Sequence, residues 1–151
     1  MAFTSYATEA QGDTYMTAYR LTTSVWTAAS SANIVKALAQ ATMMIDRLNF
    51  IGELEDEDQD NQFPRGDDTT VPVDIQYACI ELAYSLLDGV DPEMEYNNTQ
   101  MDGMGYSSVR TTYNRQTIPE HIAAGIPSIA AWRFLKPYLR SGLSLRLERD
   151  S

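Results

Sequence analysis

Hydrophobic and polar positions separate most clearly between Pro72 and Gly89. The strongly polar residues of this stretch recur at intervals of seven, four and three positions, and they are Asp74, Glu81, Ser85 and Asp88. This spacing gathers them into one stripe of a helix, so most of the remaining helix surface is apolar. Such a helix must be covered by other elements on several sides. We therefore expect a central core helix that begins after Pro72 and ends before Gly89, a left-handed C-cap.

The chain before this helix begins with a helix start signal. Thr8 and Gln11 have the spacing of a capping box, so we expect a helix from there to about Arg20. Gly12 lies inside this helix and should weaken it. The stretch that follows is polar and interrupts the helical pattern. It contains Trp26, which we interpret as an anchor of the hydrophobic core.

Two more helices are indicated by capping residues and apolar periodicity. After Ser30 or Ser31, apolar residues recur every three or four positions to near Phe50. Pro127 opens a last helix, which Pro137 ends. Three apolar residues of this last helix are expected to share one face and close the core, and they are Ile129, Trp132 and Leu135.

Residues 52–70 are acidic and have no hydrophobic periodicity, which is typical of a long loop that is functional or mobile. Four aspartates have part of the spacing of a calcium-binding loop, and they are Asp56, Asp58, Asp60 and Asp67. However, Asn61 occupies the position of the required glycine, and the last position is Asp rather than Glu. We therefore interpret the segment as a solvated loop whose charges repel one another.

Two segments are expected to be extended. Residues 103–115 are rich in β-branched and aromatic residues after a glycine, which predicts a strand or an extended arm. Near the C-terminus, apolar and polar residues alternate from Leu143 to Leu147. Two pairings are open for this alternating segment: with the arm of the same chain, or with the edge of a partner's sheet.

These elements predict a mainly α protein, a small bundle of about four helices with long loops. A length of 151 residues fits one domain with its own core. We divide the chain into a helical domain, residues 1–139, and a C-terminal tail, residues 140–151. No apolar run approaches the roughly 18 residues of a membrane span, and the N-terminus lacks the features of a signal peptide. The protein is expected to be soluble and made inside a cell.

The chain has a net charge of −10, and its charged residues are unevenly distributed along the sequence. Residues 51–102 hold fifteen acidic residues and one basic residue, Arg65, whereas residues 103–151 hold seven basic and three acidic residues. An acidic middle followed by a more basic end is typical of an interaction protein with two different faces.

The residues that could carry chemistry are few. The single cysteine, Cys79, excludes an internal disulfide and lies on the central helix, where we expect a small buried hydrophobe. The single histidine, His121, excludes a site with several histidine ligands. It follows a second capping box, Thr117 and Glu120, with a proline inside the first turn, and we expect it to be solvated. No nucleophile elbow, phosphate loop, metal site or cofactor site is indicated.

Several weak motifs occur in an order that carries more information than any one of them. They are Trp26 before the amphipathic helix, Phe63–Arg65 after the acidic loop, Val71–Pro72 before Ala78–Ala83, the glycine-led segment Gly105–Tyr113, and Phe134–Leu139. In this order they resemble a family of small tailed-phage proteins over nearly the whole chain. The family is often labelled "putative DnaT-like single-stranded-DNA-binding protein", and its kin resemble head–tail connector adaptors of phage necks. One departure is Phe63, where the family more often has tryptophan.

The resemblance implies a structural role in the virion. It implies that the helices form the body of a dodecameric ring under the portal, that the ring encloses the DNA channel, and that the tail docks on the portal. The partners would be the portal ring, neighbouring copies of the chain and the next neck, stopper or tail protein. DNA would be only passing cargo. The protein would be made in the host cytoplasm and end in the neck between head and tail, with no membrane partner.

Two sets of residues are assigned to this role. The residues expected to dock on the portal are Tyr138, Arg140, Leu143, Leu145, Arg146, Leu147 and Arg149. The residues expected to face the lumen or the next neck protein are Glu55, Asp56, Glu57, Asp58, Asp60, Asp67 and Asp68. Truncation after Leu139 is expected to leave the fold intact and to abolish attachment to the portal.

Two other functions are alternatives to the adaptor. Single-stranded-DNA binding needs aromatic side chains among basic ones, and the group that fits is Tyr106, Arg110, Tyr113 and Arg115. The net charge of −10 opposes this function. An enzyme comes third, because the chain offers no catalytic set of residues.

Overall fold

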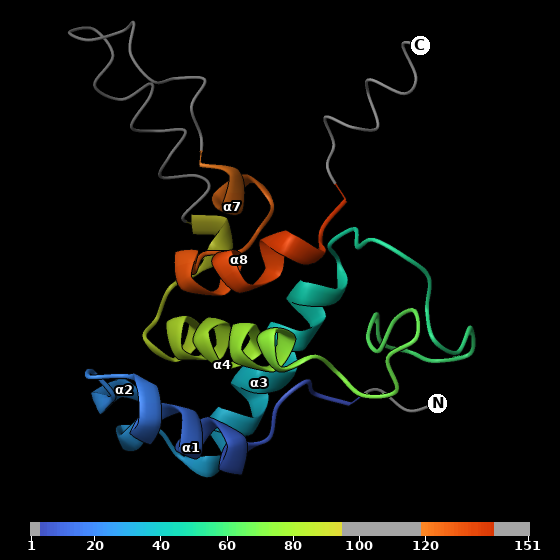
Figure 1. Ribbon diagram of the computed structural model, residues 1–151. Helices are drawn as coiled ribbons and strands as arrows, with labels where there is room; N and C mark the ends of the chain where they lie inside the picture. Colours follow the sequence, from blue (N-terminus) through green and yellow to red (C-terminus); the bar gives the residue numbers. More distant parts are fainter. Residues whose placement is uncertain (1–3, 95–118, 141–151) are drawn as a thin grey trace, which may run out of the picture.

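The computed structural model describes residues 4–94 and 119–140, and in these ranges the protein is mainly helical (Figure 1). The helices are α1 (Glu9–Tyr19), α2 (Ser24–Ala28), α3 (Ser31–Asp46), α4 (Val73–Leu87), α7 (Glu120–Ala123), α8 (Ile129–Leu135) and the 3₁₀ helix η1 (Lys136–Tyr138). The predicted mainly α class is confirmed, and α1, α3, α4 and α8 are the helices of seven residues or more in these ranges. The arm at residues 103–115 and the alternating tail lie outside the described residues.

Helix α4 is the centre of the fold, as its apolar circumference predicts. It packs against α1, α2, α3 and α8, and Figure 1 shows it between α8 on one side and α1 and α2 on the other. Side chains all around α4 are fully buried, and they include Ile75, Ala78, Cys79, Ile80, Leu82 and Ala83. Pro72 is the N-cap, and Gly89 follows the C-cap with a φ of +92°. Both predicted boundaries of this helix are confirmed.

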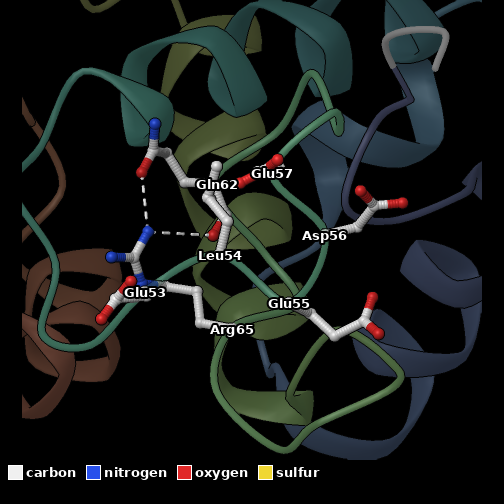
Figure 2. Close-up of a pocket in the computed structure, with 7 residues that line it drawn as sticks. All are labelled: Glu53, Leu54, Glu55, Asp56, Glu57, Gln62 and Arg65. Carbon is white, nitrogen blue, oxygen red and sulfur yellow. Dashed lines mark hydrogen bonds between the residues drawn. The ribbon is translucent and has the colours of Figure 1, made fainter.

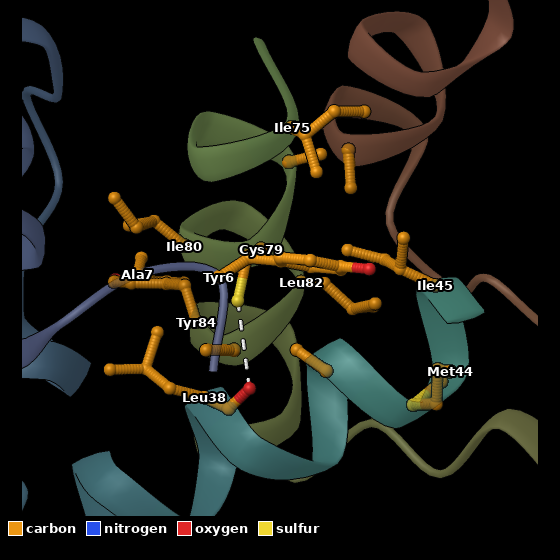
Figure 3. Close-up of a cluster of buried hydrophobic side chains, with 14 of the residues drawn as sticks. Tyr6, Ala7, Leu38, Met44, Ile45, Ile75, Cys79, Ile80, Leu82 and Tyr84 are labelled. Atoms are coloured by element: carbon orange, nitrogen blue, oxygen red, sulfur yellow. Dashed lines mark hydrogen bonds between the residues drawn. The ribbon is translucent and has the colours of Figure 1, made fainter. Parts of the chain in front are cut away.

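A large part of the core lies where α3 packs against α4 (Figure 3). There Cys79 lies against Leu38, with the thiol 3.5 Å from the Leu38 carbonyl oxygen. Burial raises the pKa of the Cys79 thiol to about 11. The expected role of Cys79 as a small buried hydrophobe is confirmed. No helix among the described residues combines the length and the apolar character needed to cross a membrane.

Helix α1 confirms the capping box and shows a packing role for Gly12 that was not predicted. The Thr8 hydroxyl accepts from the Gln11 amide at 3.1 Å, and the Gln11 side chain accepts from the Thr8 amide at 2.9 Å. A Cβ at Gly12 would lie 2.3 Å from Cζ2 of Trp26. That indole is 2% exposed and donates to Asp13 at 2.8 Å, so it is fixed in place. Gly12 is therefore the residue that lets α1 approach Trp26, the predicted core anchor.

Several predicted boundaries were wrong by a few residues. The stretch expected to be only a polar break contains helix α2, and α3 ends at Asp46 rather than near Phe50. Ser30 is the cap of α3, and its hydroxyl accepts from the Asn33 amide at 3.2 Å. Helix α7 begins after Pro119, so this proline precedes the first turn instead of lying inside it.

The core face of α8 differs from the prediction. Ile129 is 47% exposed, whereas Ala131, Trp132 and Leu135 are buried. Positions three or four residues apart lie on one side of a helix, so Ala131 and Trp132 both lie beside Leu135, whereas Ile129 is six positions from Leu135 and lies off that side. Ser128 caps the helix, and the chain continues as η1, which contains Pro137, before it becomes extended.

We expect Gly12→Ala to destabilise the protein by about 1–3 kcal/mol, because the added methyl group overpacks the contact with Trp26. Helix propensity alone predicts the opposite sign, a gain of up to about 1 kcal/mol. Urea unfolding measures the difference. Thr17→Ala, at an exposed position of the same helix, is the control and should change stability by about 0.5 kcal/mol or less. A stabilised Gly12→Ala protein would contradict the assigned contact.

Candidate functional site

The acidic loop, residues 52–70, presents its carboxylates to solvent. The seven residues expected to face the lumen or the next neck protein are all exposed, namely Glu55, Asp56, Glu57, Asp58, Asp60, Asp67 and Asp68. The backbone of the loop nevertheless folds on itself. The Gly66 amide donates to the Glu53 carbonyl at 2.8 Å, and Leu54 pairs with Arg65 in an isolated antiparallel bridge. The loop is thus a shaped surface of high negative charge.

Arg65, the one basic residue of the loop, does not neutralise these carboxylates. Its guanidinium donates to the Gln62 side-chain oxygen at 2.8 Å and to the Ile51 carbonyl at 3.0 Å. Figure 2 shows Arg65 turned towards Gln62, with the carboxylates of Glu55 and Asp56 pointing elsewhere. Together with Glu53, Leu54 and Glu57, these residues line an open hollow of about 690 Å³. The arginine organises the backbone and leaves the loop strongly negative.

A buried polar cluster pins the second half of the loop to the N-terminal segment. The Tyr6 hydroxyl donates to the Asp46 carboxylate at the end of α3. The same hydroxyl accepts from the amides of Gln62 at 3.0 Å and Phe63 at 3.1 Å. Burial raises the pKa of Asp46, although the hydrogen bonds from Tyr6, Gln62 and Asn61 act in the opposite direction.

Asn61 and Phe63 complete this anchor. The Asn61 side chain donates to the Thr4 carbonyl at 2.9 Å and to Asp46 at 3.2 Å, and it accepts from the Thr4 amide at 3.2 Å. The Phe63 ring packs against Phe50, with ring centroids 4.7 Å apart. Asn61, which departs from the calcium-loop pattern, is therefore a buried structural residue. The carboxylates are solvated as expected, but the loop that carries them is pinned.

The C-terminal end of the described chain lies at the base of the same loop (Figure 1). The Ile51 amide donates to the Tyr138 carbonyl at 2.9 Å, and Leu139 pairs with Phe50. The Tyr138 hydroxyl donates to Asp74 at 3.2 Å, and the Arg140 side chain donates to the Phe50 carbonyl at 2.8 Å. Tyr138 and Arg140, both predicted to dock on the portal, thus make contacts within the body.

Arg140, the first residue of the predicted tail, is in contact with the helical domain through Phe50. The other predicted docking residues lie outside the described residues, and they are Leu143, Leu145, Arg146, Leu147 and Arg149. The same holds for Tyr106, Arg110, Tyr113 and Arg115, the group weighed for DNA binding.

Sequence analysis missed a buried ionic cluster on α4. Glu81 is 8% exposed, accepts from the Tyr15 hydroxyl at 2.5 Å and pairs with Arg20 at 2.9 Å. The Arg20 guanidinium lies 3.8 Å from the centre of the Tyr84 ring. Glu81 belongs to the polar stripe of α4, and its bond with Tyr15 joins α1 to α4. Its residues come from distant parts of the sequence, so spacing gave no signal for it.

Sequence analysis also missed an aromatic strip across three helices. Tyr15 and Tyr19 of α1 both contact Tyr77 of α4, with ring centroids 4.8 and 5.8 Å apart, and Tyr77 contacts Phe134 of α8 at 5.7 Å. Tyr19 is 66% exposed, so one end of the strip faces solvent. The one available signal was the four-residue spacing of the two tyrosines in α1.

Among the residues that the structure describes, no three His, Cys, Asp or Glu side chains are arranged to hold a metal ion. His121 was expected to be solvated, but it is half-buried and its Nδ1 lies 2.9 Å from the Ile126 carbonyl. This contact exists because the chain turns back at Gly125, where φ is +87°.

We expect Tyr6→Phe to destabilise the protein by about 1–3 kcal/mol, because it removes the acceptor of two loop amides and the donor to Asp46. The acidic loop should also become more susceptible to proteolysis. Urea unfolding and limited proteolysis measure the two effects. Tyr19→Phe, at an exposed tyrosine, is the control and should change neither. Equal stability of the two variants would show that the Tyr6 hydroxyl does not anchor the loop.

One comparison with known proteins gave a match. Residues 2–150 match the family model described as "Putative DnaT-like ssDNA binding protein". Neither a curated protein nor a solved structure matches the chain. The match covers almost the full length, in agreement with the resemblance found in the sequence. The chain belongs to this DnaT-like family.

Proposed function

We propose that the protein is a head-to-tail adaptor of a tailed-phage neck, which works by shape and docking and without catalysis. One observation carries the proposal: the carboxylates of the acidic loop stay exposed, while hydrogen bonds from buried residues and from Arg140 hold the loop in place. A loop held in this way can present a fixed charged surface to a partner or to a channel.

The charge of the loop suits a wall past which DNA must move. Residues 53–68 carry eight carboxylates and one arginine, and that arginine is turned to the backbone. Phosphates are repelled by such a surface, so DNA passes without binding to it. In a ring of copies under the portal, the loop would line the lumen or meet the next neck protein. The position of the protein in the virion neck follows from this proposal.

The C-terminal segment is proposed to attach the ring to the portal. It follows Arg140, whose contacts with residues 49–52 hold that residue at the base of the loop. The predicted alternating residues beyond it would add to an edge of the portal or insert between its subunits. Neighbouring copies of the chain complete the proposed ring.

Native mass spectrometry with the portal ring of the same genome tests this function. We expect a complex with about one copy of the protein per portal subunit, as a ring stacked on a ring requires. A chain truncated after Arg140 should keep its urea midpoint and lose the complex. This cut replaces the one after Leu139, because Arg140 belongs to the folded body. Failure of the full-length chain to bind the portal at any concentration would refute the adaptor role.

Single-stranded-DNA binding is the second candidate, and the aromatic strip favours it. The family description names this activity, and exposed Tyr19 next to Tyr77 and Arg20 offers a face on which a base could stack. Against it stands the charge of the chain, −10, which weakens any attraction for phosphates.

Titration of a labelled oligonucleotide at two salt concentrations tests this candidate. If the strip binds DNA, Tyr19→Ala should weaken binding by about 5- to 150-fold, the cost of one lost stacking contact. Binding should also weaken steeply as salt rises. Met43→Ala, at an exposed apolar residue of α3, is the control and should bind like the unchanged protein. Absence of binding at low salt would eliminate this function.

A further inference from the structure

The outer face of α3 combines exposed apolar residues with positive charge. It is the side of the helix opposite the residues buried against α4, and its large apolar and charged side chains are Val35, Lys36, Met43 and the C-cap Arg47. Val35 is 55% exposed and Met43 is 50% exposed, although the solvent-facing positions of a helix are usually polar. The one acidic residue of α3, Asp46, is bonded to Tyr6 and lies off this face.

The charges of this face have no counter-charge in contact within the described part of the chain. Lys36 and Arg47 are exposed, and neither forms a hydrogen bond or an ion pair there. Asp91 and Glu93 line an open hollow of about 400 Å³ together with Arg47, but neither carboxylate pairs with it. Asp91 instead accepts from the Glu93 amide at 2.9 Å. The outer face of α3 is therefore a basic and partly apolar surface in a protein whose net charge is −10.

A second surface, with the opposite charge, lies where the end of α1 meets the start of α4. There Tyr19 contacts Tyr77 with ring centroids 5.8 Å apart, and Val73 lies one helical turn before Tyr77. Tyr19 is 66% exposed and Val73 is 54% exposed. The pKa of Tyr77 is raised, first by its hydrogen bond with Tyr19 and then by burial and by the nearby Asp74 carboxylate, which is exposed. We call these four residues the acidic aromatic face.

The two faces are complementary in charge and in apolar character. Interface cores are enriched in tyrosine and methionine, and opposite charges around them fix the register of two partners. Arg20, the cation next to Tyr19 in the sequence, is paired with Glu81 and so does not cancel the charge of Asp74. Either face placed against a copy of itself would bring like charges together. Residues 55–60 of the acidic loop offer charge but include no apolar residue, so the acidic aromatic face fits α3 better.

We propose that the outer face of α3 docks on the acidic aromatic face of a second copy of this chain. Because the contact joins two different surfaces, it is head-to-tail and repeats from one copy to the next, which gives a ring if the rotation closes. The contact does not use residues 55–60 of the acidic loop, so their carboxylates stay available to a channel or to another protein. The inference rests on the proposed function, since the proposed ring needs a contact between copies.

Sedimentation velocity of the free, full-length protein and of two variants tests this contact. Val35→Asp places a carboxylate on the α3 face, opposite the acidic partner face. The double variant Tyr19→Ser, Val73→Ser removes two apolar side chains from the acidic aromatic face. All three positions are more than half exposed, so both variants should fold, and urea unfolding checks this. Thr17→Asp adds the same charge on the side of α1 opposite Tyr19 and is the matched control.

We expect the unchanged protein and Thr17→Asp to form assemblies larger than a dimer as their concentration rises. Each of the two interface variants alone should associate about tenfold or more weakly, because each has lost one side of the contact. A mixture of the two variants keeps one intact contact, between the α3 face of the double variant and the acidic aromatic face of Val35→Asp. The mixture should therefore form a one-to-one dimer and stop there.

Several results would overturn the proposal. They are an unchanged protein that stays monomeric up to about 1 mM or stops at a dimer, a mixture that forms no dimer, and association that only one of the two variants weakens. The last result would mean that one face pairs with itself. No portal is present in this measurement, so failure here is distinct from failure of the adaptor role, which the portal complex tests.

Discussion

The fold depends on the need to cover α4 on nearly every side. A helix with apolar residues around most of its circumference cannot remain at a surface, so α1, α2, α3 and α8 pack around it. The close approach of α1 requires Gly12, and the ionic contact of Glu81 with Arg20 satisfies the polar stripe where it enters the core. Because these helices pack on α4, the long acidic loop is held at one end of the body by a separate set of contacts.

That attachment solves an electrostatic problem. Neighbouring carboxylates on one loop repel each other and favour an expanded chain. The protein opposes this tendency with a few buried contacts to residues 61–63 of the loop, chiefly the Tyr6 hydroxyl, the Asn61 amide and the Phe63 ring. The polar anchors form hydrogen bonds with backbone groups, and the aromatic anchor packs in the hydrophobic core. The negative charge can then stay concentrated and exposed without unfolding the segment that bears it.

The sequence predicted the features that depend on local pattern. The limits of α4, the capping box at Thr8, the burial of Trp26 and the exposure of the loop carboxylates all follow from spacing and composition. The sequence did not predict features that arise only when distant segments meet. Gly12 reads as a helix defect until Trp26 lies against it, and Arg140 reads as part of a tail until Phe50 is its neighbour.

The candidate site also has a part that the sequence predicted and a part that it did not. Its charge was visible in the sequence, whereas its anchors, Tyr6 and Asn61, were not, because a tyrosine or an asparagine has no periodicity of its own. Ile129 was misplaced for a related reason: the core face of a short helix is decided by its neighbours as much as by its pattern. Sequence analysis therefore identified the charged surface, whereas the structure identified the residues that hold it in place.

The contact between Arg140 and Phe50 spans 90 residues of sequence, and it has a consequence for the order in which the protein is completed. During synthesis the Tyr6 segment is already present when the acidic loop emerges, so the far half of the loop can attach at once. The contact of Arg140 with the near half can form only after residue 140 has been made, since contacts of long sequence separation form slowly. Until then the near half is held only by Arg65 and by the backbone contacts within the loop.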